Sequence, residues 1–212
     1  LGLPEQAAKY YSLAWAVASN GENESKMSPD IAIGYINALL SDSKPEKVIS
    51  TFSGRLKEFR DVPMVLELYV EALKASGASP AAIIPVVEQL KDAYKSRMNQ
   101  IAIRANINPI LDSGKKTSPE LADAILQLGI FYLTTADMSE LAAEEFKRAK
   151  LFGAKDDIVE MLQAAIELKK SDAKAAVTIE KYAKNSAYAN LLLAEYFAQI
   201  GNTEKEQKFI AQ

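Results

Sequence analysis

Closely spaced carboxylates are the side chains of this chain that could most readily perform chemistry. Glu67 and Glu71 lie four residues apart, a spacing that places both on one face of a helix. Asp156, Asp157 and Glu160 are also close together. Paired carboxylates can bind a metal ion or transfer protons. Surface acids are common on helical proteins, however, and the two aspartates suit a helix N-terminus, where the helix dipole favours negative charge. We therefore predict that the chain is not an enzyme and has no catalytic residue, cofactor or metal site.

The segment 94–117 is the second candidate, because its charge differs from that of the rest of the chain. It holds five basic residues and one acidic residue, a local net charge of +4 on a chain of net charge −3: Lys95, Arg97, Arg104, Lys115 and Lys116 against Asp112. Such a segment could receive an acidic partner. A solvated surface is the favoured alternative, because the charges are spread over 24 residues. Nucleic-acid binding is not expected, since the chain is acidic overall and exposed aromatic residues do not alternate with the basic ones.

The sequence Ser113-Gly114-Lys115-Lys116-Thr117 has some features of a phosphate-binding loop. It lacks the first glycine and the Gly-Lys-Ser/Thr ending of such loops, and no strand pattern precedes it. We expect an ordinary flexible connection between two helices here.

The composition limits the chemistry further. The chain has no cysteine and no histidine, which excludes disulfides, thiolate catalysis and the commonest general base and metal ligand. No run approaches the 18 apolar residues that a bilayer-spanning helix needs, and no signal peptide is visible, so no direct membrane insertion is expected. A soluble chain of this composition fits the cytoplasm or the periplasm equally well.

The periodicity of the apolar residues is helical along the whole chain, with no alternating strand pattern. Ser118-Pro119 is a helix start signal, and Gly77 and Gly201 are stop signals. The predicted helices cover 4–19, 29–41, 44–58, 63–76, 80–98, 99–112, 118–135, 139–151, 156–169, 172–184, 186–200 and 203–211. Pro85 and Pro109 argue against one straight helix through the middle of this list.

Six residues between 128 and 149 have a spacing that lets two antiparallel helices interlock: Leu128, Gly129, Tyr132, Ala142, Phe146 and Ala149. The small residues allow the two backbones to approach, and the large ones fill the space that remains. This pattern resembles the tetratricopeptide repeat (TPR), a unit of two helices that stacks into a solenoid. The resemblance implies an all-α fold, a right-handed superhelical array of antiparallel helix pairs.

Weaker matches extend the resemblance over most of the chain. The expected organisation is a single array over 1–212, with a half repeat at 1–19, pairs at 29–58, 63–98, 118–151, 156–184 and 186–211, and an irregular insert at 94–117. Because the first helix of the first pair is missing, we expect a fragment of a longer array. Tyr10, Tyr11 and Trp15 are then expected to pack against that missing helix, and their exposure could promote a homodimer through the repeat ends.

The resemblance also implies a function, a non-catalytic scaffold that binds a peptide or helix of a protein partner in a concave groove. The inner positions of the family fall on Met64, Glu67 and Glu71 in one repeat, on Asp123, Leu126, Ile130, Leu133 and Thr134 in the best repeat, and on Tyr188, Leu191 and Glu195 in the last. Between these repeats they fall on Asp157, Glu160, Ala164 and Glu167. Leu126 and Ile130 have a favoured alternative role as core contacts to the adjoining repeat.

A second interpretation of the same resemblance is a structural, self-associating module of a larger multi-repeat protein. Arrays of this kind are used by bacterial cell-envelope assembly and secretion machines, which makes such a component one form of this alternative. The sequence does not identify the partner in either case.

Overall fold

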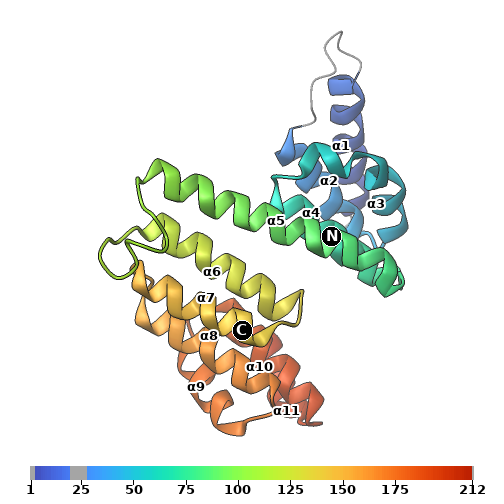
Figure 1. Ribbon diagram of the computed structural model, residues 1–212. Coiled ribbons are helices and arrows are strands. Elements are labelled where there is room, and N and C mark those ends of the chain that lie inside the picture. The colour runs from blue at the N-terminus through green and yellow to red at the C-terminus, as the bar shows by residue number, and fades with distance from the viewer. Residues whose placement is uncertain (1–2, 20–27, 212) are drawn as a thin grey trace. The chain divides into compact units, whose positions relative to one another are not determined.

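In the computed structural model, the described residues are 3–19 and 28–211, and all regular elements among them are helices (Figure 1). They form eleven α-helices and one 3-10 helix, and these residues contain no strand. The all-α class predicted from the sequence is confirmed. Residues 1–2 of the predicted half repeat lie outside the described residues.

The chain divides into two compact units, Leu1–Arg97 and Met98–Gln212. The first unit contains α1 (Leu3–Ser19), α2 (Pro29–Ser41), α3 (Pro45–Phe52), the 3-10 helix η1 (Ser53–Phe59) and α4 (Pro63–Ala75). Helix α5 (Pro80–Arg104) begins in the first unit and ends in the second. The second unit continues with α6 (Pro119–Thr134), α7 (Ser139–Leu151), α8 (Asp156–Lys169), α9 (Ala173–Ala183), α10 (Ala187–Gln199) and α11 (Thr203–Ile210). One continuous array over the whole chain stays a prediction.

Local sequence signals account for most helix boundaries. Helices α2, α3, α4, α5 and α6 all begin with proline, whose missing N–H costs nothing in the first turn. The Ser118 hydroxyl accepts a hydrogen bond from the Leu121 N–H at 3.3 Å and so caps α6. The predicted stop signals Gly77 and Gly201 follow α4 and α10 with φ of +72° and +73°, a left-handed conformation that glycine adopts without strain.

The separate helix predicted over 99–112 is wrong. Helix α5 runs unbroken from Pro80 through Pro85 to Arg104, and turns occupy the residues after it up to α6. The true stop is Asn106, which takes a left-handed φ of 51°. The next N–H, that of Ile107, then bonds back to the Ala102 carbonyl at 2.9 Å and closes the helix end.

Aromatic side chains build much of the core of the first unit. Trp15 on α1 packs edge-on against Tyr35 of α2 and Phe52 of α3, with ring centroids 5.8 Å and 5.0 Å apart. The Tyr11 ring lies against Gly34 of α2. The expectation that Tyr11 and Trp15 pack on a missing helix is therefore corrected, because α2 and α3 cover them, whereas Tyr10 is exposed.

Consecutive helices of the second unit pack on one another from α6 to α11, and α8 also contacts α10. Gly129 of α6 lies against the Phe146 ring of α7, and a Cβ built on this glycine would stand 2.5 Å from a ring carbon. The partners expected around this contact are all buried in the structure: Leu128, Tyr132, Ala142, Phe146 and Ala149. The close approach of α6 and α7 therefore depends on a residue without a side chain.

We predict that Gly129→Ala lowers the free energy of unfolding by about 1–3 kcal/mol, because the new methyl group overlaps a ring that is fully buried. Urea denaturation followed by circular dichroism measures the change. Gly54→Ala is the matched control, since no atom lies within 4 Å of a Cβ at Gly54. The control should change stability by less than about 0.5 kcal/mol or raise it slightly. Equal losses in the two variants would contradict the proposed packing role.

Candidate partner-binding groove

The apolar residues of the groove predicted on α6 are largely covered in the structure. Leu126 is 8% exposed and Leu133 is 1% exposed, whereas Ile130 is half-buried. The burial of Leu126 and Leu133 favours a core role for both. For Leu126, this is the favoured alternative of the sequence-based prediction. A partner could reach these two leucines only if the helices around them separated.

The remaining predicted groove residues on α4, α6 and α10 lie at least partly at the surface. On α4 of the first unit, Met64 and Glu71 are exposed and Glu67 is half-buried. The exposed members on α6 and α10 of the second unit are Asp123, Thr134, Leu191 and Glu195. Tyr188 of α10 is half-buried, and burial together with the nearby Glu195 charge raises the pKa of its hydroxyl to about 12.

A real hollow of about 720 Å³ lies over α8, bordered by α7 and α9. We call it the α8 groove. None of the predicted groove residues on α4, α6 and α10 lines it. Three of the four inner positions predicted on α8 do line it, namely Glu160, Ala164 and Glu167. Its lining residues come from three helices: Ser139, Glu140, Ala143 and Lys147 from α7, Glu160, Gln163, Ala164, Ile166 and Glu167 from α8 with Lys170 directly after it, and Thr178 from α9.

Small side chains make the hollow possible. Ala143 of α7, Ala164 of α8 and Thr178 of α9 contribute little volume where the three helices meet. Larger residues at these positions would fill the space between α7 and α9. The Gln163 side chain is exposed at the same place, so its amide can both donate and accept hydrogen bonds.

The walls of the α8 groove carry both signs of charge. Glu167 and Lys170 form an ion pair at 3.0 Å, and Glu160 is 3.8 Å from Lys181 of α9. All four side chains are more than half exposed, and ion pairs of this kind contribute little to stability. Both carboxylates can therefore exchange their present partners for a basic group of a ligand at little cost.

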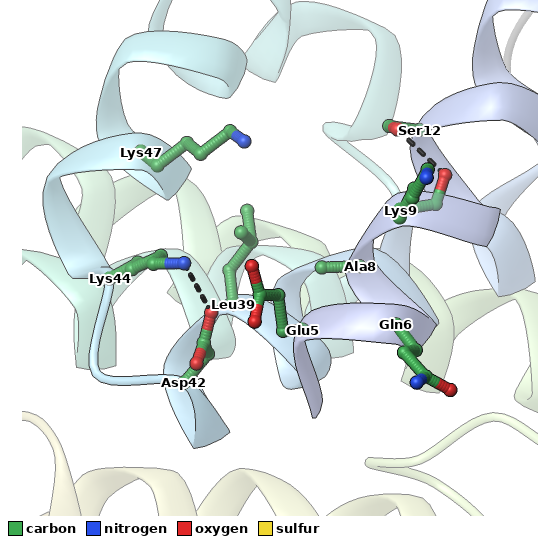
Figure 2. A pocket seen from close by; sticks show the side chains of 9 residues that line it. All are labelled: Glu5, Gln6, Ala8, Lys9, Ser12, Leu39, Asp42, Lys44 and Lys47. Carbon is green, nitrogen blue, oxygen red and sulfur yellow. Dashed lines mark hydrogen bonds and ion pairs between the residues drawn. The ribbon is translucent and has the colours of Figure 1, made fainter. Parts of the chain in front are cut away.

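The first unit has a smaller and more polar hollow between α1, α2 and α3, of about 420 Å³ (Figure 2). Lys9, Lys44 and Lys47 line it together with Glu5 and Asp42. Figure 2 shows the Lys44 ammonium directed at Asp42, 2.6 Å from its carboxylate, and a hydrogen bond and the charge of Asp42 raise the pKa of Lys44. The sequence alone does not reveal this cluster, because Lys44 and Lys47 are close along the chain but Lys9 lies on another helix, α1.

A half-buried hydrogen bond joins α4 to α5 within the first unit. The Tyr94 hydroxyl donates to the Glu67 carboxylate, and Tyr94 itself is buried. Burial raises the pKa of Glu67, and the hydrogen bond from Tyr94 offsets only part of that effect. Glu67 therefore faces a structural partner, whereas Glu71, its expected companion in a carboxylate pair, is exposed.

Neither a metal centre nor a membrane span emerges from the parts of the chain that the structure describes. No three acidic side chains within residues 3–19 and 28–211 are grouped so that they could hold a metal ion. In the same ranges, no helix combines the length and the apolar character needed to cross a bilayer.

No family model, curated protein or solved structure matches the chain.

The burial of the Glu67 carboxylate predicts a stability that depends on pH. Because the pKa of Glu67 is raised, the folded chain keeps this proton at pH values where the unfolded chain has already lost it. The contribution of Glu67 to the free energy of unfolding therefore falls as pH rises from its ordinary pKa of 4.5 through the raised value. Glu67→Gln keeps an acceptor for Tyr94 and removes the charge, so it should gain stability relative to the natural chain at neutral pH and lose that gain in acid. Urea denaturation at both pH values measures the difference.

Tyr94→Phe supplies the opposite perturbation. It leaves the carboxylate half-buried without this donor, and should lower the free energy of unfolding by about 1–3 kcal/mol at neutral pH. Tyr10→Phe is the matched control on a tyrosine that is 71% exposed and should have no measurable effect. A gain from Glu67→Gln that does not vary with pH would show that the carboxylate is not desolvated.

Proposed function

We propose that this chain is a non-catalytic scaffold that binds a segment of a protein partner in the α8 groove. The observation that carries the proposal is the hollow itself, which is lined by small side chains from three helices and by charged side chains of both signs. Grooves between packed helices are common binding sites for extended segments and for amphipathic helices. The sequence has no histidine and no cysteine, the side chains that most often act as general base or thiolate nucleophile, so a scaffold is a simpler assignment than an enzyme.

We also infer that the helices of the second unit form a TPR-like array. Each helix of this unit packs on the next, and α8 and α10, the first helices of two successive pairs, touch one another. Lys169 links the end of α8 to the end of α6. It forms a salt bridge of 3.0 Å with Asp137 and donates a hydrogen bond to the Leu133 carbonyl. First helices in a row support the stacking that such an array requires.

The chemistry of the groove suggests what the partner segment carries. An extended segment has free N–H and C=O groups, and Gln163, Ser139 and Thr178 offer side chains that can bond to them. The hollow has room for small apolar side chains beside Ala143 and Ala164, which contribute little volume to its lining. Glu140, Glu160 and Glu167 outnumber Lys147 and Lys170 along the walls, so a segment with a basic residue is favoured over an acidic one.

The proposal is tested by filling the groove. Ala143→Arg places a long side chain in the lining of the α8 groove, at a half-buried position of a helix, where arginine is a good helix former. The partner is first recovered by affinity purification on the unaltered chain. We expect Ala143→Arg to raise the dissociation constant for this partner by about tenfold or more. Isothermal titration calorimetry with the purified partner measures the dissociation constant.

Two further variants separate the α8 groove from other surfaces. Ala82→Arg makes the same change at an exposed position of α5 and should leave the dissociation constant unchanged. Leu191→Glu alters the face of α10 that the TPR resemblance assigns to partner binding, where Leu191 is 54% exposed. Loss of binding with Leu191→Glu and not with Ala143→Arg would move the site to that face and refute the α8 groove. Circular dichroism should show the same helicity for all three variants.

A further inference from the structure

Three large aliphatic side chains stand in water where α5 ends and the segment 105–117 begins. Ile103 is 78% exposed, Ile110 is 84% exposed and Leu111 is 67% exposed. We call these three residues the loop patch. Single exposed aliphatic residues are normal on protein surfaces, but three within nine positions indicate a contact surface.

The loop that carries Ile110 and Leu111 is held in shape by hydrogen bonds. The Asn108 side-chain oxygen accepts from the backbone N–H groups of Ile110 and Leu111, at 2.9 Å and 3.1 Å. The Asp112 carboxylate accepts from the Asn108 N–H at 2.8 Å and from the Lys116 ammonium at 3.0 Å. These bonds fix a turn whose tip points two aliphatic side chains outward.

The base of the same loop is anchored to the protein. Ile107 is 8% exposed, and its N–H bonds to the Ala102 carbonyl at 2.9 Å. Lys116 donates a further hydrogen bond to the Asn106 carbonyl at 3.0 Å. The exposure of Ile110 and Leu111 is thus a property of an ordered loop with one aliphatic residue turned inward and two turned outward.

The charges around the loop patch are positive on balance. Arg104, Lys115 and Lys116 stand against Asp112 and Glu120 between residues 98 and 120, a net charge of +1. The unit as a whole has 14 basic and 16 acidic residues between 98 and 212, so its remainder is negative. Arg104 pairs with Glu120 at 2.7 Å and Lys116 with Asp112, which leaves Lys115 as the cation of this group best placed for an outside anion.

We propose that the loop patch docks on an anionic lipid surface, with Ile110 and Leu111 entering the headgroup region and Lys115 lying beside anionic headgroups. Three side chains are too few for a stable protein interface, which buries about 800 Å² on each partner. A bilayer demands no matching surface, because aliphatic side chains at a protruding loop leave water on insertion and nearby lysines add attraction. Such docking is peripheral and requires no spanning helix.

Co-sedimentation of the full chain with lipid vesicles tests the proposal. Vesicles of phosphatidylcholine alone are compared with vesicles that also contain phosphatidylglycerol, in about a 7:3 ratio. We expect weak, reversible binding to the anionic vesicles that decreases as salt is added. The double variant Ile110→Ser with Leu111→Ser should reduce the partition coefficient by about tenfold or more. Lys115→Gln should reduce it by about fivefold.

The matched control changes two aliphatic residues of similar exposure on other helices, Val177→Ser with Ile210→Ser. It should bind vesicles as the natural chain does. No binding of the natural chain, equal binding to both kinds of vesicle, or equal losses in the two double variants would overturn the proposal. A concentration-dependent dimer in gel filtration that is lost only in the Ile110→Ser, Leu111→Ser variant, without vesicle binding, would instead identify the loop patch as a contact between two copies of the chain.

Discussion

The close approach of α6 and α7 at Gly129 and Phe146 is the constraint on which the second unit depends. Two helices can pack this tightly only where one of them lacks a side chain, and the Phe146 ring occupies the space that results. Because this ring is fully buried, neither helix can rotate about its axis without losing the contact. The orientation of α7 in turn decides which of its residues face α8, and so decides that Ala143 and Lys147 line the α8 groove.

The first unit uses the same device with the chain direction reversed. There, the glycine is Gly34 on the later helix and the aromatic residue is Tyr11 on the earlier one. Tyr11 is half-buried, unlike Phe146, so its ring has room to move. A glycine facing an aromatic ring therefore fixes helix spacing in both units, but only the contact in the second unit is enclosed by other side chains.

The sequence predicted the helices well because their boundaries are set by local chemistry. Prolines at helix starts, the Ser118 cap and glycines at helix ends act within one turn of the chain, so a single sequence shows them. The exception is α5, which was predicted as two helices over 80–98 and 99–112 and is one helix that passes Pro85 and stops before Asn106. Proline near a helix start removes only one hydrogen bond, and the buried residues Leu90 and Ala93 continue the helix beyond it. Asparagine is a weaker stop signal than glycine, which explains why the prediction passed over it.

The candidate site was harder to predict, because helical periodicity identifies a face but not the neighbours of that face. Glu160, Ala164 and Glu167 were placed together on one side of α8, and the structure shows that side bordered by α7 and α9. The TPR resemblance put Leu126 and Leu133 at inner groove positions, with a core role as the favoured alternative for Leu126, and tertiary packing covers both leucines. The α8 groove and the loop patch lie in the same unit and differ in chemistry, since one has small side chains between charges and the other has large aliphatic side chains beside lysines. Under the two proposals, surfaces so different select different kinds of partner, and the second unit holds a protein segment close to a lipid surface.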